Sequence, residues 1–101
     1  MRILFDQGTP LPLRRYLLNH SVVTAFELGW SRLTNGDLLT AAEKQFDVFV
    51  TTDQQQNLAG RQIAILVLPF ASWPKLERRI PEIVAAIEAL NPGDYIAFDF
   101  P

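Results

Sequence analysis

The stretch from Val48 to Asp53 constrains the fold of this 101-residue chain more than any other. It begins with three apolar residues and ends abruptly in Thr51, Thr52 and Asp53. A strand covered on both faces, as in a parallel sheet, reads as a nearly unbroken apolar run. Polar residues that follow it stand at the carboxyl end of the strand, which is where ligands bind in open α/β sheets. The sequence therefore predicts a central parallel strand that brings these three residues to a candidate site.

The amino terminus repeats this arrangement. The apolar residues 3–5 are followed at once by Asp6. If the two strands are neighbours, Asp6 and Asp53 meet at one edge of the sheet. Asp37 opens the helix predicted before the central strand, and that end of the helix packs near the carboxyl ends of the strands. We therefore expect Asp6, Asp37 and Asp53 to converge.

Strand patterns alternate with helical patterns along the chain. Strands are expected at 2–6, 22–26, 47–52, 63–68 and 95–98. Helices are expected at 9–19 and 36–46, and a last helix, with Pro81 in its first turn, is expected to follow a short turn from Pro74 and to reach residue 90. Thr9 is the expected N-cap of the first helix. This alternation indicates an α/β three-layer sandwich, with a mostly parallel five-stranded sheet in the order 2-1-3-4-5 and helices on both faces. The ten-residue connection 53–62 is short for a parallel crossover.

The composition predicts one domain over residues 1–101 that can bury its own core. The absence of cysteine excludes disulfide and thiol chemistry and suits a cytoplasmic protein. A strand beginning at residue 2 argues against a signal peptide, and the longest apolar run, 63–68, is too short to span a membrane. The net charge of −2, without basic runs longer than pairs, argues against a DNA-coating protein. The apolar content of 49% fits either a buried subunit interface or a compact core.

Three carboxylates at one sheet edge repel one another unless a cation is present. Mg²⁺ and Mn²⁺ take oxygen ligands, and such an ion could activate water and stabilise a phosphoryl transition state. Around the acids, the candidate supporting residues are Thr51, Thr52 and Gln7, and the candidate phosphate contacts are Arg14 and Arg32. Each acid also has an ordinary interpretation. An aspartate after a strand often caps the next turn, and a first-turn aspartate such as Asp37 stabilises a helix dipole.

Two segments resemble the paired signature of PIN-domain nucleases. Residues 37–42 read Asp-Leu-Leu-Thr-Ala-Ala, and residues 49–53 read Phe-Val-Thr-Thr-Asp. Nearly the whole chain resembles a compact bacterial PIN-like family, a domain of unknown function, through residues 6–10 and 55–60 in particular. The resemblance implies a metal-dependent ribonuclease fold that acts on RNA. It also implies the toxin half of a toxin–antitoxin pair, with an antitoxin-like protein as partner, and a cytoplasmic homodimer.

The chain departs from that family at two places. Gln7 stands where the family has a glutamate, and the segment after Asp53 is shorter than in the family. Three hypotheses follow. The chain is a Mg²⁺- or Mn²⁺-dependent ribonuclease in which Asp6, Asp37 and Asp53 bind the metal; it is a catalytically decayed PIN-like domain that binds a partner protein; or it is a receiver-like signalling domain. The third lacks the usual second acid beside Asp6 and the lysine after the last strand.

Overall fold

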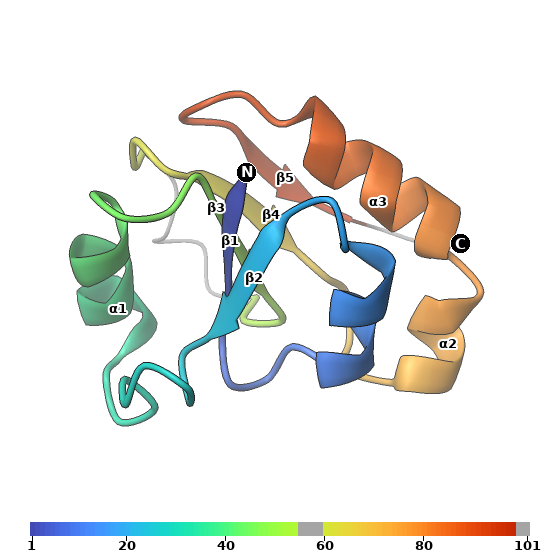
Figure 1. The fold of residues 1–101 in the computed structure, drawn as a ribbon, viewed down its shortest axis with the longest axis horizontal. Helices are drawn as coiled ribbons and strands as arrows, with labels where there is room; N and C mark the ends of the chain where they lie inside the picture. Colours follow the sequence, from blue (N-terminus) through green and yellow to red (C-terminus); the bar gives the residue numbers. More distant parts are fainter. Residues whose placement is uncertain (55–59, 99–101) are drawn as a thin grey trace.

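In the computed structural model, which describes residues 1–54 and 60–98, five parallel strands form one sheet (Figure 1). The strands are β1 (Arg2–Phe5), β2 (Ser21–Thr24), β3 (Val48–Thr51), β4 (Ala64–Val67) and β5 (Tyr95–Ala97). Their order across the sheet is β2-β1-β3-β4-β5, and every neighbouring pair is parallel. The predicted strand order is confirmed, so β1 and β3 lie side by side.

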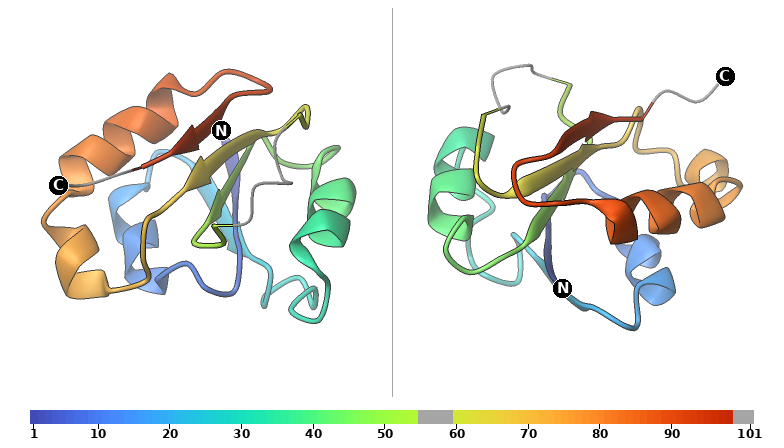
Figure 2. Two further views of the ribbon diagram at one scale, coloured as in Figure 1. Left: turned by 180° about the vertical axis from the view of Figure 1, so that it is seen from behind. Right: turned by 90° about the horizontal axis from the view of Figure 1, so that it is seen from above.

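Helices cover both faces of this sheet (Figure 2). One face packs on α1 (Asn35–Ala42), and the other packs on η1 (Leu11–Tyr16), α2 (Trp73–Glu77) and α3 (Ile80–Ala89). Because side chains alternate along a strand, consecutive apolar residues enter different layers. Ile3 and Phe5 pack under α3, whereas Leu4 packs under α1. The three-layer sandwich is therefore built by strands that are apolar on both faces.

The first helix differs from its prediction in length and in type. A helix over 9–19 was expected, but η1 is a 3₁₀ helix of six residues. Its hydrogen bonds join residues three positions apart, since the Leu13 N–H donates to the Pro10 carbonyl and the Leu17 N–H to the Arg14 carbonyl. Two prolines, at 10 and 12, lack the N–H groups that an α-helix would use. Thr9 does not cap this helix, because its hydroxyl bonds elsewhere, as described below.

The short connection between β3 and β4 does not prevent parallel pairing. Val48 pairs with Ala64 and Thr51 with Val67, in a continuous register. The described residues of the connection, 52–54 and 60–63, contain neither helix nor strand. The segment 55–59, which belongs to the family resemblance, lies outside the described residues. In the part of the chain that the structure covers, no helix has the length and apolar character needed to cross a membrane.

Candidate functional site

The carboxyl edge of the sheet is the edge at which β1, β2, β3 and β4 end. Asp6 follows β1 there, and Asp53 lies two residues beyond the end of β3. Because β1 and β3 are paired, these two acids follow neighbouring strands, as the strand order predicts. The backbone N–H of Asp6 also donates to the Val50 carbonyl at 3.1 Å, which continues the pairing beyond β1.

The Asp6 carboxylate is buried, with the residue 7% exposed, and hydroxyl groups satisfy both of its oxygens. The Thr51 hydroxyl donates to Oδ2 at 2.5 Å, and the Thr9 hydroxyl donates to Oδ1 at 2.6 Å. Thr9 Oγ1 also lies 2.9 Å from the Val50 carbonyl oxygen. A buried carboxylate needs such partners, because an unsatisfied charge in the interior is very costly. Asp6 therefore joins the end of β1 to the end of β3 and to the loop that leads into η1.

Thr51 links the two acids. Its hydroxyl donates to Asp6 and accepts the backbone N–H of Asp53 at 2.9 Å. Thr52 is half-buried and lies against the loop after β1, since a Cβ placed on Gly8 would be 2.6 Å from Thr52 Oγ1. The predicted supporting role of Thr51, which is to orient an acid through its hydroxyl, thus has a direct geometric counterpart.

The structure does not bring Asp37 into a metal site with the other two acids. Among the described residues, no three acidic or histidine side chains form a group that could hold a metal ion. Asp37 is exposed in the first turn of α1, where its N–H donates to the Thr34 hydroxyl. Leu38 and Leu39 face the sheet, so the preceding residue is turned outward. The expected convergence of three acids is not observed, and the residues present do not fit a divalent ion bound by all three.

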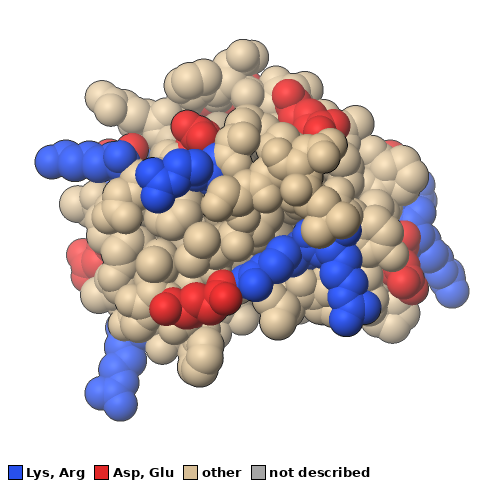
Figure 3. Space-filling view, in the orientation of Figure 1, with Lys and Arg blue, Asp and Glu red and all other residues tan. Residues whose placement is uncertain are grey.

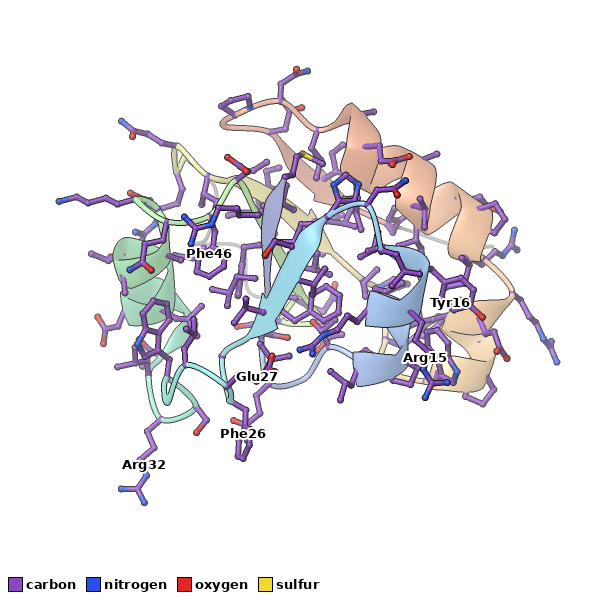
Figure 4. The ribbon with its side chains drawn as sticks, in the orientation of Figure 1. Arg15, Tyr16, Phe26, Glu27, Arg32 and Phe46 are labelled. Atoms are coloured by element: carbon purple, nitrogen blue, oxygen red, sulfur yellow. The ribbon has the colours of Figure 1, made fainter. Side chains whose placement is uncertain are left out.

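The two arginines predicted to contact phosphate differ in their surroundings. Arg14 forms a two-pronged ion pair with Glu27, in which Nη1 lies 3.4 Å from Oε2 and Nη2 contacts Oε1. The Arg14 Nε is buried, without a hydrogen-bond partner in the described part of the chain. Most of this guanidinium is therefore occupied or covered. Arg32 is exposed, in the loop between β2 and α1, and points away from the protein (Figure 4).

Glu27 closes the end of β2. Its carboxylate accepts bonds from Arg14 and from the Thr24 backbone N–H, at 2.9 Å for the latter. Hydrogen bonds, first from Arg14 and second from the Thr24 backbone, lower the pKa of Glu27 below its ordinary value. The charges on the face seen in Figure 3 are interspersed, and blue and red groups do not separate into large patches of one sign.

A pocket of about 330 Å³ opens at the carboxyl edge beside Asp6. It is lined by Asp6, Gln7, Thr9, Leu11, Arg14, Thr24, Phe26 and Glu27. Leu11 and Phe26 are 55% and 73% exposed, which is unusual for large apolar side chains placed together at a hollow. Phe26 projects from the end of β2 into solvent (Figure 4). A larger hollow, about 630 Å³, lies at the amino end of the sheet, but no predicted site residue lines it. We therefore take the smaller pocket as the candidate site.

Sequence reasoning missed the apolar rim of this site. Leu11 was assigned to a helix and Phe26 to a strand end, and neither position has a local signal that marks it as exposed. The Arg14–Glu27 pair joins η1 to the turn after β2, across thirteen positions of the chain, so no spacing within one helix or one strand predicts it. Comparisons of this chain with models of protein families, with curated proteins and with solved structures gave no match.

Proposed function

We propose that this chain is a PIN-like domain that binds a partner protein at the carboxyl edge of its sheet and does not cleave RNA there. The observation that carries the proposal is the state of Asp6. Its carboxylate is buried and accepts hydroxyl protons from Thr9 and Thr51. An acid satisfied in this way needs no cation to be stable, and it serves to hold strand ends together.

Two further features support binding over catalysis. Asp6, Asp37 and Asp53 form no three-ligand metal group, and neither do any other described acids. Beside Asp6, the exposed side chains of Leu11 and Phe26 flank a pocket. Exposed apolar groups around a hollow are typical of protein interaction sites. The family resemblance adds an antitoxin-like protein as the expected kind of partner.

The proposal is tested by titrating the purified chain with MnCl₂ and MgCl₂ in a calorimeter and by incubating it with structured and unstructured RNA. We expect no heat of binding at millimolar metal and no cleavage with either ion. Manganese-dependent cleavage that Asp53→Asn abolishes would contradict the proposal. Asp37→Asn is the matched control, because it neutralises an exposed carboxylate in the first turn of α1.

The partner half of the proposal has its own test. The chain is co-expressed with the product of the neighbouring reading frame and purified through a tag on the chain. A complex that withstands gel filtration, and that Phe26→Ser disrupts, is the expected result. A complex that forms equally well with this variant would place the partner elsewhere on the surface.

A second candidate is the metal-dependent ribonuclease, which one observation favours. Thr51 ties the Asp6 carboxylate and the Asp53 backbone to one hydroxyl at the end of two paired strands. Acids that follow two neighbouring strands could give a weaker site than three. The calorimetric and cleavage measurements above separate this candidate from the first.

A further inference from the structure

The pocket beside Asp6 is lined by both apolar and charged side chains. Leu11 from η1 and Phe26 from the loop after β2 form the apolar rim, and both are largely exposed. The lining also includes the charged side chains of Asp6, Arg14 and Glu27. A volume of about 330 Å³ lies at the lower end of the range for ligand pockets, so one large side chain or a small molecule fills it.

The charges of the lining decide between kinds of occupant. Arg14 is neutralised by its ion pair with Glu27, and Asp6 carries the remaining negative charge. With one net negative charge and its arginine already paired, the pocket disfavours phosphate. It suits an apolar group that comes with a positive charge.

We propose that the pocket takes a large apolar side chain of a partner protein, with a lysine or arginine of the same segment meeting the negative lining. This inference rests on the proposed partner-binding function and names the chemistry of the partner. The apolar side chain lies between Leu11 and Phe26 and removes their exposed surface from water. The basic residue lies near the carboxylates of Asp6 and Glu27. The backbone of the segment is within reach of Gln7, an exposed side chain at the pocket with an amide to donate and accept.

The test uses the full chain and a displayed library of random twelve-residue peptides. We expect enriched peptides that combine a large apolar residue with a lysine or arginine. Their affinity should fall about tenfold in Phe26→Ser or Leu11→Ser, as for the loss of an interface anchor. Both residues are exposed enough that these substitutions leave the fold intact. Leu18→Ser is the matched control, since Leu18 is 83% exposed and does not line the pocket, and it should change the affinity less than twofold.

Several outcomes would overturn the inference. These are the absence of enriched peptides, the enrichment of acidic peptides, or binding that Phe26→Ser leaves unchanged. A labelled uridine 20-mer that binds the chain and is lost in Phe26→Ser would assign the pocket to nucleic acid. The outcomes are separable from those for the proposed function. Metal-dependent cleavage contradicts the proposed function, whereas a chain that neither cleaves RNA nor selects such peptides contradicts this inference alone.

Discussion

At the scale of single residues, the decisive feature is a buried aspartate that neutral groups stabilise. Both oxygens of Asp6 accept hydroxyl protons, from Thr9 and from Thr51. Hydrogen bonds to charged groups contribute more to stability than bonds between neutral groups, and a buried charge left short of partners is costly. The Thr51 hydroxyl also accepts a hydrogen bond from the Asp53 N–H, so it stabilises both the Asp6 carboxylate and the backbone at Asp53.

The substitution Thr51→Val should therefore destabilise the protein. It keeps the shape of the side chain but removes the hydroxyl, which leaves one oxygen of buried Asp6 without its donor. We expect the free energy of unfolding to fall by about 1–3 kcal/mol, measured by urea denaturation. Thr52→Val is the control, because the structure shows no hydrogen bond to its hydroxyl in the described residues. Equal losses in both variants would show that Asp6 does not depend on Thr51.

The positions of Asp6 and Asp53 could be predicted from the sequence, because each follows an apolar run that only a buried strand explains. The partners of Asp6 could not. Thr9 precedes two prolines and has the signature of a helix cap, yet its hydroxyl turns back to Asp6 and the Val50 carbonyl. That choice depends on the closeness of β1 and β3, which is a property of the assembled sheet.

At the scale of secondary structure, the strands were predictable and the first helix was not. Apolar runs place all five strands to within one or two residues. The segment 9–19 has the composition of a helix. Its prolines lack the N–H groups that α-helical hydrogen bonds need, and the segment forms the 3₁₀ helix η1 instead. By contrast, α1 begins within one residue of its predicted start, although it ends at Ala42, four residues before the predicted end. The Thr34 hydroxyl caps it by accepting the Asp37 N–H at 3.2 Å.

Removing that cap should weaken α1 by a measurable amount. Thr34→Ala deletes the only side-chain acceptor found for the Asp37 N–H in the described residues, and N-cap substitutions of this kind cost about 1 kcal/mol. The loss is measured by urea denaturation followed by far-ultraviolet circular dichroism. Thr34→Ser, which keeps the hydroxyl, should recover most of the lost stability. If serine were no better than alanine, the cap would contribute nothing and the register of α1 would be set by packing alone.

At the scale of the whole molecule, one sheet separates two apolar clusters. The larger cluster lies under η1, α2 and α3, with Trp73 packed against it. The smaller lies under α1, with Trp30 packed against it. Each of the strands β1, β3 and β4 contributes to both clusters, so we expect the two clusters to unfold together. These clusters do not bear on the predicted homodimer, which stays a prediction.

The two tryptophans allow this coupling to be measured. Trp30→Phe leaves Trp73 as the reporter of one cluster, and Trp73→Phe leaves Trp30 as the reporter of the other. In each variant, the urea midpoint from fluorescence should coincide with the midpoint from circular dichroism, because small domains unfold in one cooperative transition. A fluorescence midpoint that precedes the loss of ellipticity in one variant would mean that its cluster melts independently.

The place of α3 in the chain has a consequence for how the protein emerges from the ribosome. β1, β3 and β4 are synthesised first, and the residues that cover their shared face, Ile83 and Ile87 among them, come afterwards. At bacterial and eukaryotic synthesis rates, roughly 5–20 residues per second, that delay amounts to about a few seconds. During this interval the apolar face of the sheet that α3 covers is exposed in the nascent chain. We expect chaperones that bind apolar surfaces to bind it until α3 has been synthesised.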